Sequence, residues 1–347
     1  MHILITGGAG YVGAVLVPLL LKKGYRVRVL DLFLYGDVFI SHKHLDLHRG
    51  DIRRPDVVKK ALKDIDTVIH LACISNDPSF ELDPALGKSI NYDATIALID
   101  AAKKAGVRRF IYASSSSVYG VKKEKNVTED LPLEPLTDYS KYKALCETYV
   151  LTRQDKDFTP VIIRPATVCG YSPRMRLDLT VNILTISALV NHSMTVFGGS
   201  QKRPNIHIQD MCRAYMTLLT APKKKIAGKI FNAGFQNYTV MELALMVKRV
   251  LGDSSIPIDV KPSSDNRSYH ISSAKIGKEL GFETKHTVED AIADIKKAFE
   301  KGLLPSALTE KRYYNVKQLK HFLSSPPRRR GSRVKEGLDS RLHGKDN

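Results

Sequence analysis

Tyr139 and Lys143 are the side chains of this sequence whose types and spacing could move a proton. They are four residues apart, so on a helix they would share one face. A tyrosine hydroxyl is a poor base at neutral pH because its ordinary pKa is about 10. A neighbouring ammonium favours the phenolate, which could accept a proton from a substrate hydroxyl while a cofactor accepts hydride. The spacing alone also arises by chance on solvated helices, so it requires support from other motifs.

A glycine-rich turn directly after the strand-like run Ile3–Thr6 gives that support. Its glycines follow the pattern Gly-x-x-Gly-x-x-Gly and open a helical stretch. Such glycines let the backbone approach a pyrophosphate, which the free N–H groups of the helix N-terminus then hold. Five residues of the turn are predicted to bind a dinucleotide: Gly7, Gly10, Tyr11, Val12 and Gly13.

The ends of the next strand-like runs add residues that suit an adenosine group. Asp31 ends the second run, where a carboxylate can accept both hydroxyls of the ribose. Its charge would repel a 2′-phosphate, so NAD is favoured over NADP. Four further residues are expected to line the cofactor crevice: Asp51 and Ile52 beside the adenine ring, and Leu71 and Ala72 after the fourth run. His70, which precedes them, fits a buried core histidine better than a catalyst.

These residues require a scaffold in which strands and helices alternate. Six apolar runs are predicted strands: Ile3–Thr6, Arg26–Asp31, Leu45–Gly50, Thr67–Leu71, Arg109–Ala113 and Thr159–Arg164. Most are continuous runs of Val, Ile and Leu, which is typical of parallel strands covered on both faces. Helices are expected over Tyr11–Lys23, where Pro18 should cause a kink, and over Pro84–Gly106 and Asp138–Gln154. The alternation predicts an α/β fold with a Rossmann-type doubly wound parallel sheet.

The second half of the chain predicts a smaller, interleaved α/β lobe. We expect residues 1–165 to form the NAD-binding domain, rejoined by a strand near 229–236, and residues 166–323 to form a substrate-binding lobe. Helices of this lobe are expected at 178–191, 210–220, 239–251, 273–280 and 287–301. The segment 324–347 is basic and rich in Ser, Pro, Arg and Gly, so it is expected to be disordered.

The composition narrows the class of protein. The formal net charge of +18 raises the possibility of nucleic-acid binding. The basic residues are dispersed without interleaved aromatic residues, so a solvated basic surface explains the charge better, and nucleic acid is not an expected partner. The four cysteines are widely separated, which argues against a metal site and against a disulfide framework.

The sequence shows no sign of membrane attachment. No apolar run approaches the roughly 20 residues that a bilayer-spanning helix needs. Met1 leads directly into the first predicted strand, which leaves no room for a signal peptide. The expected location is therefore the cytoplasm.

Taken together, the motifs resemble those of an extended short-chain dehydrogenase/reductase. The resemblance is to the NAD-dependent epimerase/dehydratase group, which acts on nucleotide sugars, and it covers roughly residues 1–301. Besides the residues above, four segments carry it: Ser114-Ser115-Ser116-Ser117-Val118-Tyr119-Gly120, Arg164-Pro165, Arg203-Pro204-Asn205-Ile206-His207 and Phe231-Asn232-Ala233-Gly234. It implies an enzyme with NAD as cofactor, a nucleoside-diphosphate sugar as substrate, and no metal.

The resemblance also implies roles for individual residues. Ser115, four residues before Tyr119, would hydrogen-bond the reacting oxygen together with Tyr139. Lys143 would also hold the nicotinamide ribose, and Pro165 would lie beside the cofactor. In this scheme the catalytic residues are Ser115, Tyr139 and Lys143.

Further implications concern the substrate and the assembly. Five residues would contact the substrate: Ser115, Ser116, Thr167, Arg203 and Arg267. The two arginines would hold the diphosphate, for which guanidinium groups are well suited. Relatives usually carry Asn in the segment 166–168, where this chain has Ala-Thr-Val.

Relatives also commonly form homodimers through two helices per subunit, which here are 84–106 and 138–154.

The favoured activity is epimerisation of the sugar, at C4, by transient oxidation to a ketosugar. Elimination of water needs an acid and a base at the sugar's C5 and C6. Ser116 and Ser117 stand where sugar 4,6-dehydratases carry Asp-Glu, so dehydration is disfavoured. Two alternatives stay open: a nucleotide-sugar dehydrogenase or 4-ketoreductase with net redox turnover, and a non-catalytic NAD-binding protein with a regulatory or RNA-contacting role.

Overall fold

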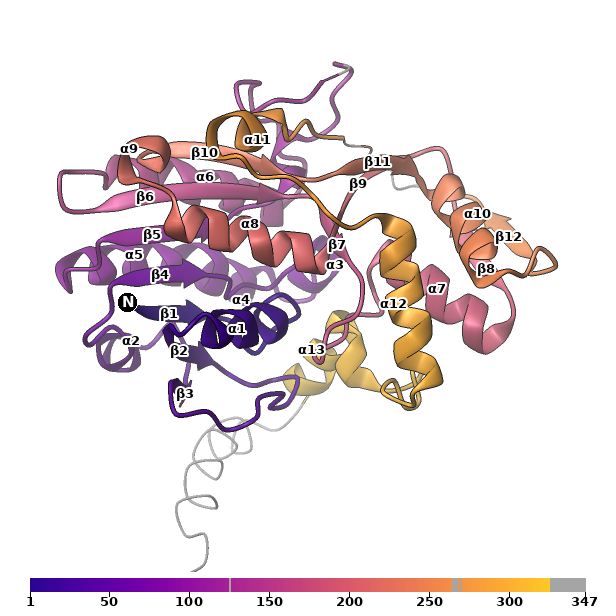
Figure 1. Ribbon diagram of the computed structural model, residues 1–347, viewed down its shortest axis with the longest axis horizontal. Coiled ribbons are helices and arrows are strands. Elements are labelled where there is room, and N and C mark those ends of the chain that lie inside the picture. Colours follow the sequence, from indigo (N-terminus) through magenta and orange to yellow (C-terminus); the bar gives the residue numbers. More distant parts are fainter. Residues whose placement is uncertain (125, 264–267, 269, 325–347) are drawn as a thin grey trace, which may run out of the picture.

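A seven-stranded parallel sheet forms the centre of the fold (Figure 1). The structure is a computed structural model that describes residues 1–124, 126–263, 268 and 270–324. In spatial order the strands are β3 (Leu45–Arg49), β2 (Arg26–Asp31), β1 (His2–Thr6), β4 (Thr67–His70), β5 (Arg109–Ala113), β6 (Thr159–Pro165) and β10 (Lys229–Ala233). The order reverses between β1 and β4, and open α/β sheets bind ligands outside the carboxyl ends of the strands at such a point.

Helices cover both faces of this sheet. In β1, Ile3 and Ile5 contribute to the core on one face, and Leu4 contributes to the core on the other. The first face is covered by α1 (Gly13–Lys22) and α8 (Ile208–Thr220). The second face is covered by α2 (Pro55–Ala61), α5 (Ala94–Lys104) and α6 (Asp138–Thr152). Burial on both faces explains why the strands are continuous apolar runs rather than alternating ones.

A smaller α/β unit lies beside the sheet, on the right in Figure 1. One of its sheets has the order β11 (Gln236–Thr239), β9 (Lys202–His207) and β7 (Thr167–Cys169), and another pairs β12 (Ile258–Lys261) with β8 (Met194–Phe197). A separate core is surrounded by α7 (Thr180–Asn191), α10 (Val240–Leu251) and α12 (Val288–Glu300). The shorter helices are α3 (Asp77–Phe80), α4 (Pro84–Lys88), α9 (Lys223–Ile226), α11 (Ala274–Leu280) and α13 (Asn315–Leu323). A π turn spans Ser89–Asp93, and 3₁₀ turns span Ser116–Tyr119 and Lys311–Tyr313.

Most predicted elements are confirmed. The six strands of the first half lie within one residue of their predicted ends. The helices α7, α8, α10, α11 and α12 also form, with ends shifted by at most two residues. Several short elements were not predicted, among them β7, β9, β11, α3, α9 and α13.

The helix predicted over 84–106 is wrong in one respect. It is not one α-helix, because the π turn separates α4 from α5. Within this turn the buried Asn91 accepts a hydrogen bond from the Ile74 nitrogen at 2.8 Å and donates one to the Ile74 oxygen at 2.9 Å. These two hydrogen bonds hold the segment that follows β4 against the π turn, which is wider than an α-helical turn. By contrast, α1 continues through Pro18, which is exposed.

Three further expectations concern the C-terminal tail, membrane-spanning helices and metal sites. The predicted disorder of 324–347 falls almost entirely on residues 325–347, which lie outside the described residues. Across the part of the chain that the structure describes, no helix has the length and apolar character needed to cross a membrane. The same residues hold no group of three or more His, Cys, Asp or Glu side chains that could bind a metal ion.

Candidate active site and cofactor pocket

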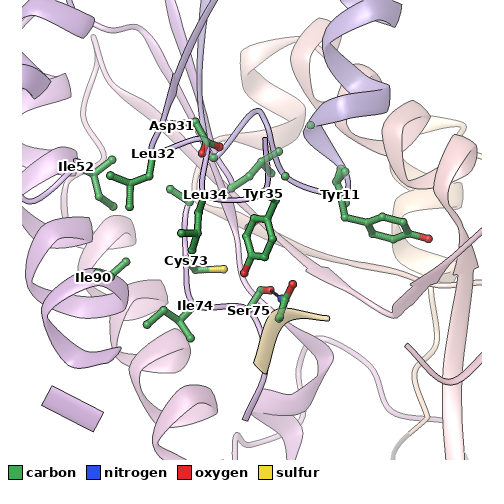
Figure 2. A pocket seen from close by; sticks show the side chains of 18 of the residues that line it. Tyr11, Asp31, Leu32, Leu34, Tyr35, Ile52, Cys73, Ile74, Ser75 and Ile90 are labelled. Atoms are coloured by element: carbon green, nitrogen blue, oxygen red, sulfur yellow. Dashed lines mark hydrogen bonds between the residues drawn. The ribbon is translucent and has the colours of Figure 1, made fainter. Parts of the chain in front are cut away.

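A cavity of about 290 Å³ lies at the carboxyl ends of the central strands (Figure 2). All of the residues predicted to bind the cofactor line it: Gly7, Gly10, Tyr11, Val12, Gly13, Asp31, Asp51, Ile52, Leu71, Ala72, Tyr139, Lys143 and Pro165. They come from segments far apart in the sequence, which the parallel sheet brings to one edge. The structure therefore joins the glycine turn and the Tyr139–Lys143 pair in a single site.

The glycine turn is tight enough to exclude side chains. Gly7 has a φ of +71°, and a Cβ there would lie 2.5 Å from the Ala72 nitrogen. A Cβ on Gly13 would lie 2.2 Å from the Gly8 oxygen, so the start of α1 packs directly on the turn. No side chain caps the N-terminus of α1. Its uncapped N–H groups and positive dipole end fit the pyrophosphate of NAD.

Asp31 lies beside this turn at the end of β2. Its carboxylate accepts hydrogen bonds from the Ala9 nitrogen at 3.0 Å and the Phe33 nitrogen at 2.7 Å. Burial raises the pKa of Asp31, while these two backbone donors oppose the rise. The carboxylate is thus fixed at the wall of the cavity, in the position expected for binding the adenosine ribose.

Tyr139 and Lys143 lie near the start of α6, which a capping box at Thr137 fixes in position. Both side chains are buried, with exposed fractions of 9% and 3%. The Lys143 Nζ donates to the Ala113 oxygen at 2.6 Å, at the end of β5. Ser115 is close enough to Tyr139 to influence its pKa, so two of the three predicted catalytic residues are neighbours.

The pKa of Tyr139 departs in the direction opposite to the one that the Tyr-Lys spacing predicts. Burial raises this pKa well above its ordinary value, and the nearby Cys73 and Asp77 add to the rise. Ser115 and the positive charge of Arg176 act against the rise. Lys143 donates to a backbone carbonyl and is not among the largest influences on this pKa.

The serine run after β5 has an ordered local geometry. The Ser115 Oγ lies 2.9 Å from the Ser117 Oγ and accepts a hydrogen bond from the Ser117 nitrogen at 3.1 Å. Ser116 is buried in the 3₁₀ turn and does not line the cavity. Its predicted contact with the substrate stays a prediction.

The other predicted substrate residues lie in the smaller unit or outside the described residues. Thr167 in β7 and Arg203 in β9 belong to the same sheet, in which Thr167 pairs with Asn205. Arg203 is largely buried and donates to the Lys202 oxygen at 3.0 Å. Neither residue lines the cavity, and Arg267 lies outside the described residues. Their contacts with a sugar diphosphate stay predictions.

His70 is a core residue, as its sequence context suggested. Its Nδ1 lies 2.6 Å from the Thr6 hydroxyl, and its Nε2 lies 2.9 Å from the Thr95 hydroxyl. Burial lowers the pKa of His70 to about 3, with Lys143 acting in the same direction. A neutral imidazole with both nitrogens paired is not available as a catalyst.

A buried polar network lies next to the predicted catalytic residues. Arg164 forms an ion pair of 2.6 Å with Glu147, and both side chains are 3% exposed. Glu147 also accepts a hydrogen bond from Ser114, the residue before Ser115. Arg164 donates to the Tyr119 hydroxyl at 2.7 Å, and this hydroxyl donates to Asn232 of β10 at 2.8 Å. The network connects the ends of β5, β6 and β10 to α6.

Sequence reasoning missed part of the cavity wall. Six of the missed lining residues are Tyr35, Arg174, Arg176, Asn315, Leu319 and Phe322. Two of them lie after β7, and three belong to α13, whose existence was not predicted. The pair of arginines in Pro-Arg-Met-Arg and the apolar spacing of Val316, Leu319 and Phe322 are the signals that could have identified these segments.

Comparisons with known proteins agree with this geometry. The model of the NAD dependent epimerase/dehydratase family matches residues 3–234. The chain belongs to this family. UDP-glucose 4-epimerase of Lactobacillus helveticus is 30% identical over 315 residues, covering 84% of this chain and 95% of that protein. UDP-glucuronic acid decarboxylase 1 of Arabidopsis thaliana is 30% identical over 318 residues, covering 88% of this chain and 71% of that protein.

A solved structure extends the comparison to three dimensions. UDP-glucose 4-epimerase of Thermotoga maritima, crystallised with UDP-glucose, superposes with a TM-score of 0.80 at 25% identity, covering 87% of this chain and 100% of that one. The resemblance inferred from the motifs is thus confirmed. As a member of the NAD-dependent epimerase/dehydratase family, the protein is an enzyme that uses NAD, with a Rossmann-type sheet.

Proposed function

We propose that this family member is a nucleotide-sugar epimerase that inverts C4 of a UDP-hexose by transient oxidation. The observation that carries the proposal is the position of Tyr139, a buried phenol that lines the same cavity as the glycine turn and Lys143. The 4-epimerases among the relatives support this choice of reaction and substrate. The two serines at positions 116 and 117 speak against dehydration because neither is an acid or base of suitable strength.

The proposed mechanism assigns a task to each catalytic residue. Tyr139 takes the proton from the sugar hydroxyl, and Ser115 hydrogen-bonds the same oxygen. NAD, when bound, would supply the acceptor and donor of the hydride at the sugar carbon, and Tyr139 gives the proton back to the same oxygen as the hydride returns. Lys143, on α6, would hold the nicotinamide ribose. The unit that contains Thr167 and Arg203 holds the nucleotide while the ketosugar turns, so that hydride can reach its other face.

Tyr139 must lose its proton before it can act as a base. Burial opposes this loss because it disfavours the charged phenolate. Among the cationic side chains, Arg176 favours the phenolate. Oxidised nicotinamide carries a positive charge and would act in the same direction. We therefore expect Tyr139 to become an effective base when the cofactor is bound in its oxidised form.

A panel of sugar nucleotides tests the proposed reaction. The purified protein is incubated with UDP-, GDP-, CDP- and dTDP-hexoses without added cofactor, and products are separated by chromatography. We expect conversion of one UDP-hexose to its C4 epimer with no accumulation of NADH. Stoichiometric NADH would instead indicate a dehydrogenase or ketoreductase. Unchanged sugars in the presence of bound NAD would favour the non-catalytic alternative.

We further propose that two chains pair through α5 and α6. Leu145 of α6 is 49% exposed, and a pairing through α5 and α6 would cover it. Light scattering should give the mass of a dimer for the wild-type protein and of a monomer for Leu145→Glu. Leu245 of α10 is 53% exposed, and Leu245→Glu is the matched control that should stay dimeric. A monomeric wild-type protein would rule out the pairing.

A further inference from the structure

Arg174 is a buried cation in the wall of the cofactor cavity. Its side chain is 4% exposed, and its guanidinium stacks on the Tyr35 ring at 3.6 Å from the centroid. Nη2 donates to the Asn315 oxygen at 2.6 Å, and Nη1 lies 3.5 Å from the Met175 oxygen. Nε is buried and has no hydrogen-bond partner among the described residues. A buried donor without a partner is costly, so a ligand group is expected there.

The charged groups around Arg174 do not pair with it directly. Asp178 forms an ion pair of 2.9 Å with Arg176 and accepts the Asn315 nitrogen at 3.0 Å. Asp31 accepts two backbone N–H groups instead. Both carboxylates attract Arg174 from a distance, but among the described residues none lies within 4 Å of it. Burial lowers the pKa of Arg174 to about 10, with the neighbouring Arg176 acting in the same direction.

The segment that carries Arg174 is fastened to the glycine turn. The Ser172 hydroxyl donates to the Tyr11 oxygen at 2.8 Å, and the Tyr11 hydroxyl donates to the Gly170 oxygen at 2.5 Å. These bonds bring Arg174 and Arg176 into the same cavity as the uncapped N-terminus of α1. Guanidinium groups and a helix N-terminus that face one cavity both favour an anion with several oxygens.

The helix α13 holds this arrangement in place. Asn315, its first residue, donates from Nδ2 to the Ser75 hydroxyl at 2.8 Å and accepts from Arg174. Gln318 donates to the Leu34 oxygen at 2.7 Å, in the loop after β2. Leu319 packs in one cluster with Tyr139. Figure 2 shows Tyr35, from the same loop as Leu34, extending into the cavity between Asp31 and Ser75.

We propose that Arg174, held by Asn315 of α13, binds the pyrophosphate of NAD from the side of the second lobe and retains the cofactor in the protein. The neighbours of Arg174 favour the dinucleotide over the sugar nucleotide. Asp31 ends β2 and Tyr35 lies in the loop that follows it, on the adenosine side of the cavity, and Arg174 stacks on Tyr35. Arg176, in contrast, pairs with Asp178 and donates to the Ser75 hydroxyl at 3.3 Å.

Binding of ligand fragments to Arg174→Gln tests this assignment. Calorimetry on cofactor-stripped protein should show NAD and ADP-ribose binding weakened by roughly 10- to 100-fold, since charge-assisted hydrogen bonds are lost. Adenosine, which lacks the pyrophosphate, should bind as it does to the wild type. NAD retained per chain after gel filtration should fall in the same variant. Arg249→Gln is the control, because Arg249 is exposed on α10 and pairs only with Glu289 among the described residues.

The stability of the cofactor-free variant separates binding from a structural role. Because the substitution removes a buried cation that is incompletely paired, the melting temperature of cofactor-free Arg174→Gln should equal or exceed that of the wild type. The increase in melting temperature on adding NAD should be smaller for Arg174→Gln than for the wild type. Arg174→Lys keeps the positive charge but lacks the planar guanidinium group. The rise in its melting temperature on adding NAD should therefore lie between those of the wild type and Arg174→Gln. Equal weakening of NAD and adenosine, or unfolding of both variants, would overturn the proposal. Normal NAD binding with weakened sugar-nucleotide binding would also overturn it, because the anion would then belong to the substrate.

Discussion

Replacing Tyr139 with Phe is expected to lower kcat by roughly 10²- to 10⁴-fold, the range of general acid–base catalysis, while NAD stays bound. The substitution removes only the hydroxyl and leaves the ring in its buried cluster. The loss should appear in kcat and not in the amount of NAD retained, because the proton acceptor is missing and the cavity is unchanged. Steady-state rates on the substrate identified from the panel, together with NAD content, provide the measurement.

A second tyrosine on the same helix supplies the control. Tyr142 packs against Phe80 and Tyr92, and its hydroxyl makes no hydrogen bond with another described residue. Tyr142→Phe should therefore keep its activity within a few-fold of wild type. If Tyr139→Phe turned over at the same rate as Tyr142→Phe, the phenol of Tyr139 would not be the proton acceptor.

Replacing Glu147 with Ala is expected to lower the free energy of unfolding by about 3–5 kcal/mol. The change leaves the Arg164 guanidinium buried at 3% exposure without its counter-ion, and it also removes the acceptor of Ser114. Burial lowers the pKa of Arg164, and the ion pair with Glu147 more than offsets this effect, so the pKa lies above its ordinary value. Urea denaturation followed by circular dichroism gives the free energy.

A solvent-exposed ion pair provides the comparison for this loss. Glu289 pairs with Arg249 at 2.7 Å, with side chains 32% and 68% exposed. Glu289→Ala should cost at most about 1 kcal/mol, because exposed pairs gain little. Similar losses for Glu147→Ala and Glu289→Ala would mean that the buried network does not support the catalytic strand ends in the way described.

The parts of the fold that could be predicted share strong local signals. The strands β1, β2 and β4 are apolar runs bounded by glycine or charged residues. The glycines in the turn after β1 have a spacing typical of dinucleotide-binding turns. Asp31 and Ala72 could be assigned to the cavity because Asp31 ends β2 and Ala72 follows β4, and parallel strands end at one edge of the sheet. Local pattern and topology were sufficient for this half of the site.

Other parts depend on contacts that sequence patterns do not encode. The helix α13 is nine residues long, and it is positioned by Asn315 and Gln318 bonding to segments more than 130 residues away in the sequence. The π turn before α5 forms because Asn91 pairs with the backbone of Ile74. The pKa of Tyr139 depends on its burial and on Arg176, neither of which the spacing from Lys143 reveals. Tertiary context therefore decided the features that were missed.

The most direct test of the account follows a deuterium label at C4 of the sugar nucleotide that the panel identifies. If Tyr139 accepts only the hydroxyl proton while hydride passes to the bound cofactor and back, the label should remain at C4 of the epimer, in ordinary water and without added NAD. Mass spectrometry and NMR of the product report the position of the label. Loss of the deuterium to solvent, or its recovery in free NADH, would contradict epimerisation by transient oxidation.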